Sequence, residues 1–284
     1  MANLHNTFIK YNQALTLTST RKKKLISSRK AVEADIINYF KGNSKLPVPK
    51  FFIQGSYKTG TMILKKDNTY DVDLGVYFEE IKGLQPKTLQ KNVANAVKNR
   101  TPSGIQHKEK CIRVIYKGEF NIDLPVYYIP PNTLITHLAT KSGWEKSDSK
   151  KLIYWLESKK DKNGQLVRLI KYTKAWANSR TKKMPSGIAL SVWIAKFYVP
   201  NNRDDIAFVK TLSNISWSIW GIECVNPVFP HDNLIASLDV NQKNYFREAL
   251  KNIITDGKRA IQEKNDTIAF NLWRKHFNKK RFVI

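Results

Sequence analysis

The stretch that decides the fold reads DVDLGVYF and runs from Asp71 to Phe78. Side chains alternate between the two faces of a β-strand, so Asp71 and Asp73 share one face while the aliphatic residues share the other. The apolar face can enter a core while both carboxylates project from the opposite face. Successive side chains on one face start about 6 to 7 Å apart, close enough for two carboxylates to share one cation or to hold a pair of cations.

A second strand pattern carries a third carboxylate. The stretch FNIDLPV, residues 120–126, places its apolar residues on one face and Asp123 on the other. If this strand lies beside the first, Asp123 joins Asp71 and Asp73, and such a cluster of like charges is favourable only when cations neutralise it. The pattern therefore predicts a metal site. For any single aspartate, the alternative is a strand end or a solvent-facing position.

The segment that precedes these strands favours phosphate binding. It reads QGSYKTGT, from Gln54 to Thr61, and follows an expected strand. Glycine lets backbone amides approach phosphate oxygens closely, and Ser56 and a helix N-terminus can donate further hydrogen bonds. The spacing matches neither a Walker loop nor a dinucleotide-binding fingerprint. Gln54, Gly55 and Ser56 are therefore candidate residues for binding the phosphates of a nucleotide.

Hydrophobic periodicity predicts an α+β fold. Four segments alternate in the manner of strands in one mixed sheet: residues 51–53, 71–78, 111–116 and 120–127. Residues 20–42 have the pattern of a long amphipathic helix, and residues 89–97 predict a helix packed beside the sheet. The first half of the chain, residues 1–150, is thus expected to form a sheet with helices.

The second half has a helical period. Helices are expected at three segments: residues 166–176, 188–197 and 245–261. Turn-rich stretches at residues 200–205 and 226–233 interrupt this pattern. We therefore expect a helical domain at residues 151–284.

The composition favours a folded chain with a polyanionic partner. The 284 residues are 42% hydrophobic, which is enough to bury a core. Lysine and arginine total 49 against 23 aspartates and glutamates, which gives a formal charge of +26. This excess attracts nucleic acid, anionic lipid or phosphorylated small molecules, and composition does not choose among them.

Cysteine usage and hydropathy indicate the compartment. Cys111 and Cys224 lie far apart and outside any Cys/His cluster, which argues against a zinc site and against a disulfide framework. No segment approaches the roughly 20 apolar residues of a membrane span, and the N-terminus lacks an apolar signal core. We expect a cytoplasmic protein with no membrane partner.

The Gly55-Ser56 turn, the strand from Asp71 and the carboxylate Asp123 together resemble the signature of the polymerase-β-like nucleotidyltransferases. The wider chain is similar to the CD-NTases, the bacterial enzymes of the cyclic GMP-AMP synthase and DncV-like group found in anti-phage (CBASS) operons. Six segments carry this resemblance: QGSYKTGT (54–61), YDVDLGVYF (70–78), FNIDLPVYY (120–128), LIKYTKAW (169–176), MPSGIAL (184–190) and NPVFPHDNL (226–234). The implied fold is a polymerase-β-like core and a C-terminal helical domain that completes the nucleotide cleft, joined by a long N-terminal spine helix.

The resemblance also implies roles for single residues. Asp71, Asp73 and Asp123 would be catalytic and bind two Mg²⁺ ions, with Mn²⁺ as a substitute, and Ser56 would contact the donor triphosphate. Lys171 and Ser186 would lie on the donor phosphates. The alternatives are a solvated lysine for Lys171 and a helix cap for Ser186.

The implied activity is synthesis of a cyclic di- or trinucleotide second messenger from nucleoside triphosphates (ATP, GTP or pyrimidine nucleotides), with release of pyrophosphate. Its product would act on a downstream effector in anti-phage defence, and the basic surface could bind an RNA activator. Two alternatives remain: a nucleotidyltransferase that modifies RNA or protein, and a nucleic-acid sensor with low activity.

Overall fold

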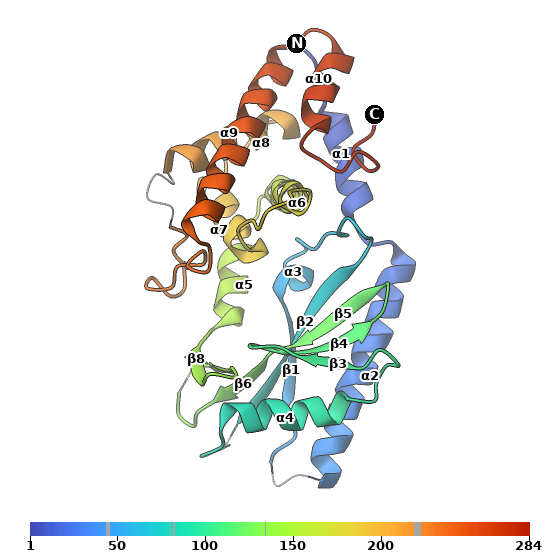
Figure 1. The fold of residues 1–284 in the computed structure, drawn as a ribbon, viewed down its shortest axis with the longest axis vertical. Helices are drawn as coiled ribbons and strands as arrows, with labels where there is room; N and C mark the ends of the chain where they lie inside the picture. Colours follow the sequence, from blue (N-terminus) through green and yellow to red (C-terminus); the bar gives the residue numbers. More distant parts are fainter. Residues whose placement is uncertain (44–45, 80, 82, 134, 219–222) are drawn as a thin grey trace. The chain divides into compact units, whose positions relative to one another are not determined.

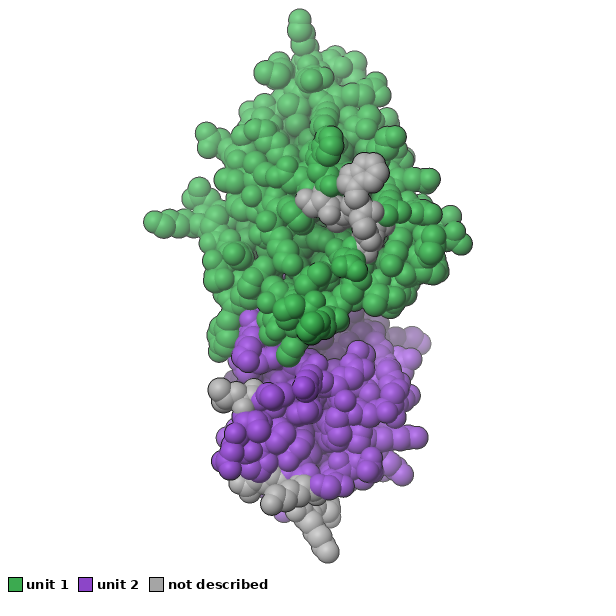
Figure 2. Space-filling view, turned by 90° about the vertical axis from the view of Figure 1, so that its left-hand side faces the viewer, with its two compact units in different colours: residues 1–16, 63–66, 154–284 green, residues 17–62, 67–153 purple. Residues whose placement is uncertain are grey.

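The computed structural model describes residues 1–43, 46–79, 81, 83–133, 135–218 and 223–284. These residues form two compact units, coloured separately in Figure 2. One, the sheet unit, comprises Leu17–Met62 and Asp67–Ile153. The other, the helical unit, comprises Met1–Thr16, Ile63–Lys66 and Tyr154–Ile284.

The sheet unit is built on one mixed sheet, in which eight strands lie within the described residues (Figure 1). Their order is β3-β4-β5-β2-β6-β7-β8, and β1 pairs with β2. The bounds are β1 (Lys50–Gln54), β2 (Tyr70–Glu79), β3 (Ile105–His107), β4 (Ile112–Tyr116), β5 (Phe120–Leu124), β6 (Val126–Ile129), β7 (His137–Ala139) and β8 (Trp144–Lys146). The predicted mixed sheet is confirmed, and β3, β7 and β8 are additions to it.

Strand β2 organises the sheet because it pairs in parallel with both β5 and β6. The sequence predicts one strand over residues 120–127, whereas Pro125 divides that stretch into β5 and β6. Proline has no backbone N–H and so interrupts the ladder. Its carbonyl still accepts a hydrogen bond of 2.9 Å from the amide of Val76, which keeps both segments beside β2.

Helices cover the sheet within its own unit. They are α2 (Ser19–Asn43), α3 (Gly55–Lys58) and α4 (Pro86–Val97), and the boundary between the units falls within α5 (Ser149–Glu157). The long helix predicted at residues 20–42 is α2, which buries Leu25, Val32, Ile36 and Phe40 along one stripe. This spacing of seven, four and four residues is that of one helix face.

The helical unit contains α1 (His5–Leu15), α6 (Gln165–Asn178), α7 (Gly187–Phe197), α8 (Asp204–Ser218), α9 (Val240–Gln262) and α10 (Asp266–Arg274). Its core is aromatic: the ring of Phe8 packs edge-on against Tyr172 and Trp273, with centroids 5.1 and 5.0 Å away. The helices α1, α8 and α10 are not predicted from the sequence, and α8 begins inside a stretch that reads as a turn.

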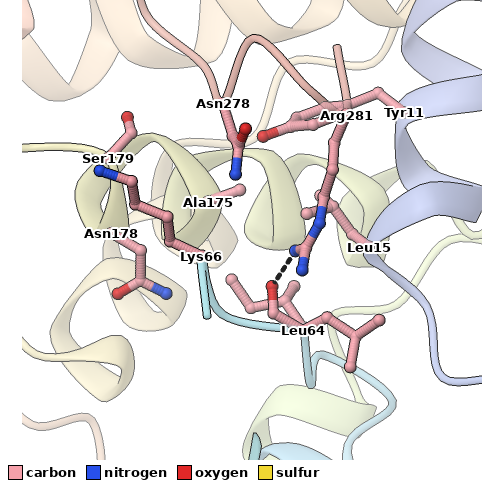
Figure 3. A pocket seen from close by; sticks show the side chains of 10 residues that line it. Tyr11, Leu15, Leu64, Lys66, Ala175, Asn178, Ser179, Asn278 and Arg281 are labelled. Atoms are coloured by element: carbon pink, nitrogen blue, oxygen red, sulfur yellow. Dashed lines mark hydrogen bonds between the residues drawn. The ribbon is translucent and has the colours of Figure 1, made fainter. Parts of the chain in front are cut away.

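Two short segments from the first 150 residues belong to the helical unit. Met1–Thr16 supplies α1, and Ile63–Lys66 is held by Arg281. The guanidinium of Arg281 donates to the carbonyl of Leu64 at 2.5 Å (Figure 3) and to that of Lys65 at 2.7 Å. The boundary expected at residue 150 places both segments in the first half of the chain. Their contacts with the helical unit are remote in sequence, so the local pattern does not reveal them.

The sequence leads to expectations for the cysteines and for the apolar content of the helices. Cys111 and Cys224 are free thiols, and burial raises the pKa of each to about 12. None of the helices within the described residues is both long and apolar enough to cross a membrane.

Candidate functional site

The aspartates of β2 and β5 lie side by side on the sheet. In the parallel register, Asp73 stands opposite Asp123 and Asp71 opposite Asn121. Paired residues of neighbouring parallel strands point to the same face, and such strands lie about 4.8 Å apart. The three carboxylates therefore share one face of the sheet, as the strand pattern predicts.

The buried face of these strands fixes that orientation. Val72 and Leu74 of β2, like Ile122 and Leu124 of β5, are at most 1% exposed. A slip of one residue would bring the aspartates into the core and the aliphatic side chains out of it. The local pattern of alternation thus determines where the carboxylates project.

The turn after β1 is fitted to one of these carboxylates. Gly55 has a φ of +64°, which favours glycine, and a Cβ atom there would lie 2.0 Å from Oδ2 of Asp73. The Asp73 carboxylate therefore lies directly against the Gly55 backbone. The turn is closed by the amide of Thr61, which donates to the carbonyl of Ser56 at 2.9 Å. Backbone amides at the start of α3 thus lie next to a carboxylate, an arrangement suited to a phosphate with its cation.

Gln54 uses its side chain inside the protein. It is 4% exposed, and its Nε2 donates to the hydroxyl of Tyr127 at 3.1 Å. Its Oε1 accepts from Tyr77 at 3.1 Å and from Ser149 at 2.6 Å. Burial raises the pKa of both tyrosines, so both hydroxyls remain neutral, with Tyr77 donating to Gln54 and Tyr127 accepting from it. The side chain of Gln54 positions the turn, and only its backbone is left for a nucleotide.

Arg113 belongs to the candidate site, although no motif in the sequence predicts it. It lies on β4 opposite Asp123, and its Nε and Nη2 donate to the two oxygens of Asp123, each at 2.7 Å. Nη2 also lies 3.4 Å from Oδ2 of Asp71. Hydrogen bonding to Asp123 raises the pKa of Arg113, so the guanidinium stays charged. Asn121 completes the group by donating to Oδ1 of Asp71 at 2.9 Å.

The donor set suits a hard divalent cation. Carboxylate oxygens are the ligands that Mg²⁺ prefers, and only a glycine at position 55 leaves room for the Asp73 carboxylate against the turn. In the arrangement described, however, no three His, Cys, Asp or Glu side chains among the described residues converge closely enough to hold a metal. Arg113 places positive charge beside both Asp123 and Asp71. Cys111 nearby stays protonated, because burial and the negative charge of Asp123 raise its pKa.

The candidates in the helical unit are engaged in local contacts. Ser186 caps α7, with its Oγ accepting from the amide of Ala189 at 3.2 Å. Lys171 is 8% exposed and donates to Oγ1 of Thr16 at 3.1 Å. These geometries match the helix-cap alternative for Ser186 and a structural role for Lys171.

Lys174, one helical turn after Lys171, is the lysine that lies beside the Ser186 cap. A Cβ atom on Gly187 would be 3.4 Å from its Cε and 3.9 Å from its Nζ. The ammonium group therefore lies close to the N-terminus of α7, where a phosphate would also be favoured. The sequence signal was present, since residues three apart on a helix are neighbours on its surface.

The mixed sheet, with two aspartates on one strand and a third on the parallel neighbour after a glycine turn, defines the polymerase-β-like nucleotidyltransferase class of fold. Residues 49–127 match the family described as "Cyclic GMP-AMP synthase DncV-like, nucleotidyltransferase domain". This segment contains all three aspartates, Gly55 and Arg113. Residues 49–127 thus match the DncV-like nucleotidyltransferase domain, and the fold of the chain is that of solved CD-NTases.

Individual relatives agree with this assignment. A "Cyclic GMP-AMP synthase" of Escherichia albertii is 30% identical over 205 residues, which are 66% of this chain and 46% of that protein. The chain thus spans less than half of that relative. The fold is similar to that of the DncV cyclic AMP-GMP synthase of Vibrio cholerae (TM-score 0.85, 17% identity, 100% of this chain and 98% of the other). It is also similar to that of the CD-NTase CdnG of Bradyrhizobium diazoefficiens (TM-score 0.83, 14% identity, 98% and 97%).

Proposed function

We propose that this chain is a metal-dependent nucleotidyltransferase that joins nucleoside triphosphates into a cyclic di- or trinucleotide and releases pyrophosphate. The observation that carries the proposal is the alignment of Asp71, Asp73 and Asp123 on one sheet face, with the Gly55 turn against Asp73. Relatives support the substrate class. The structure of CdnG is in complex with GTP, and a crystal structure of DncV is in complex with the linear intermediate 5′ pppA(3′,5′)pG.

The aspartates would hold two Mg²⁺ or Mn²⁺ ions. When bound, such ions lower the pKa of an acceptor hydroxyl and neutralise charge on the transferring phosphate. The Gly55 backbone amide and Ser56 would donate hydrogen bonds to the donor triphosphate. Asp123 would accept the proton of the acceptor hydroxyl, a role open to a carboxylate within hydrogen-bonding distance of it.

The bond changes are those of an in-line displacement. The acceptor oxygen bonds to the α-phosphorus of the donor, the bond from that phosphorus to pyrophosphate breaks, and the hydroxyl proton passes to Asp123. In the last round of the same displacement, the linear product supplies both the acceptor hydroxyl and the donor triphosphate, and a further pyrophosphate leaves as the ring closes. Holding both nucleotides in one orientation accounts for most of the expected rate gain.

The helical unit would contribute phosphate contacts of its own. We assign these to Ser186 and to Lys174, which lies beside Gly187 at the N-terminus of α7. Lys171 keeps its contact with Thr16 and supports the helix. That the helical part completes the nucleotide cleft stays a prediction of the sequence.

Supplying nucleoside triphosphates alone tests this proposal against a nucleotidyltransferase that modifies a macromolecule. The purified chain would receive all four nucleotides with Mg²⁺ or Mn²⁺, and the products would be identified by mass. Release of pyrophosphate with formation of a cyclic oligonucleotide is the expected result. Label that enters only added RNA or protein would instead establish the rival activity.

The charge of +26 supports a further role for RNA as an activator in anti-phage signalling. Binding of a polyanion to scattered lysines and arginines releases counterions and so weakens steeply with salt. Added RNA should therefore raise the rate of product formation at low salt and lose its effect at high salt. A rate that is independent of RNA at every salt concentration would contradict this regulatory role while leaving the synthase activity intact.

A further inference from the structure

Arg113 lies at the centre of the negative charge on the sheet. Its guanidinium donates to both oxygens of Asp123 and lies 3.4 Å from an oxygen of Asp71. One cationic group thus balances two of the three carboxylates. Lys108 is a more distant second cation, with its Nζ 3.9 Å from Oδ2 of Asp123.

This ion pair adds little to holding the sheet together. Arg113 and Asp123 lie on β4 and β5, which are already joined by a backbone ladder from Ile112 to Tyr116. A different fork in the same unit has a clear structural purpose: Arg100, which follows α4, donates to both oxygens of Asp35 on α2. The Arg100–Asp35 pair joins the turn after α4 to α2, and no backbone ladder connects these two described segments.

We propose that Arg113 stands in for the cation, so that its fork on Asp123 and metal binding at the carboxylates exclude each other. The inference rests on the proposed function, in which Asp71, Asp73 and Asp123 hold the metal. A divalent ion bound to Asp123 would lie within a few ångströms of the guanidinium, and the repulsion between them would break the fork. With the fork in place, no described group of three ligands has metal-binding geometry.

The arrangement has two consequences. Without metal, Arg113 prevents the like charges of Asp71, Asp73 and Asp123 from destabilising the sheet. With metal, the guanidinium is displaced from Asp123 and becomes able to pair with another anion. Metal affinity is therefore set partly by competition with an internal arginine.

Substitution by a neutral side chain tests the competition. In Arg113→Gln, calorimetric titration with Mn²⁺ alone should show binding tighter by roughly tenfold, because a competing positive charge is removed. The metal-free protein should melt at a lower temperature than the wild type. Arg100→Gln is the matched control: it also loses a forked pair in the sheet unit, so its melting temperature should fall while its Mn²⁺ affinity stays unchanged. Equal or weaker Mn²⁺ binding in Arg113→Gln would overturn the inference.

A measurement on the wild-type chain avoids dependence on a variant that fails to fold. The side-chain Nε–H resonance of Arg113 can be assigned by its absence in Arg113→Lys and followed during titration with Mg²⁺, with KCl at matched ionic strength as the control. Displacement predicts that this resonance shifts and exchanges faster with water as Mg²⁺ binds, while the Nε–H resonance of Arg100 does not change.

The outcomes separate the two proposals. Mg²⁺ binding seen by calorimetry, with an unchanged Arg113 resonance, would make the fork a permanent structural pair and overturn the inference without affecting the proposed function. Absence of any Mg²⁺ or Mn²⁺ binding, even with a non-hydrolysable nucleoside triphosphate present, would overturn the proposed metal site and this inference together.

Discussion

Each unit contains a forked pair between an arginine and an aspartate, and the two pairs differ in their surroundings. In the sheet unit, Arg113 pairs with Asp123, whose side chain is 13% exposed and which has further carboxylates as neighbours. In the helical unit, Arg168 pairs with Asp204, which is fully buried. Asp204 also accepts hydrogen bonds from Gln165 and Tyr172.

The pKa behaviour of Asp204 fits a permanent pair. Burial alone would raise its pKa, but the hydrogen bonds and positive charge of Arg168, with the bond from Gln165, outweigh burial and lower it. Its charge is thus completely balanced by groups of its own unit. On the sheet, by contrast, Asp123 pairs with Arg113 while Asp71 and Asp73 stand on the same sheet face, so three carboxylates lie together there. An arginine–aspartate pair occurs in both units. We infer that neighbouring carboxylates and solvent exposure of the aspartate distinguish a chemical site from a structural ion pair.

The largest expected effect comes from removing one carboxylate of the sheet. Asp73→Asn should reduce product formation by at least about a thousandfold, since it removes a ligand of both proposed cations. The melting temperature should remain close to that of the wild type. Asp67→Asn, on the turn before β2, serves as the control and should retain activity. Full activity of Asp73→Asn would remove Asp73 from the site.

A stability comparison of Asp204 with Asp123 tests the contrast between the two pairs. Asp204→Asn should lower the free energy of unfolding by about 2 to 3 kcal/mol, because it removes a buried charge that accepts hydrogen bonds from Arg168, Gln165 and Tyr172. Asp123→Asn should lower it by less than about 1 kcal/mol, since Arg113 can turn to Asp71 and one like charge is gone. Urea unfolding followed by circular dichroism measures both. Equal losses would mean that both pairs are structural.

The close fit of the Gly55 turn against Asp73 predicts a smaller loss of activity when position 55 carries a side chain. Two alanine variants separate this loss from the effect of backbone strain. Gly55→Ala and Gly60→Ala both place a side chain at positive φ, +64° and +71°, which costs on the order of 1 kcal/mol each. Only the Cβ at position 55 would collide with the Asp73 carboxylate, whereas position 60 has open space. Activity should therefore fall about a hundredfold in Gly55→Ala and little in Gly60→Ala. Similar activities in both variants would contradict the proposed fit.

The smallest expected effect concerns a histidine in the helical unit, His276, whose Nε2 lies 2.9 Å from Oδ2 of Asp256. Burial lowers the pKa of His276, although Asp256 opposes this shift. Below about pH 6.5, the unfolded chain therefore binds more protons than the folded one, and stability falls as the pH decreases. Between pH 7 and 5, the melting temperature of the wild type should fall by about 2 to 4 °C more than that of His276→Gln. Identical pH profiles would show that His276 does not contribute.

The placement of the aspartates on one sheet face follows from signals that are local in the sequence. A period of two places Asp71 and Asp73 on one face, and a glycine at position 55 indicates an unusual turn. Asp123 joins them only if β5 lies beside β2, and the sequence alone does not show that these strands are neighbours. The parallel register supplies that missing step.

Other features escape prediction because they depend on contacts remote in sequence. Arg113 meets Asp123 only through the register of β4 and β5, and the side chain of Gln54 is buried by tyrosines from β2 and β6. In the helical unit, the distinction between Lys171 and Lys174 requires the position of α7 beside α6. Asp204 lies in a stretch whose sequence predicts a turn, but in the structure it is the first residue of α8.

The central claim is that Asp71, Asp73 and Asp123 hold the cations of a nucleotidyl transfer. The most direct test is a crystal structure of the chain with Mn²⁺ and a non-hydrolysable nucleoside triphosphate, in which anomalous scattering locates each ion. We predict two Mn²⁺ ions within about 2.3 Å of carboxylate oxygens, shared by Asp71 and Asp73 with one also bound by Asp123. Mn²⁺ bound elsewhere, with Asp71, Asp73 and Asp123 making no contact to it, would contradict the claim.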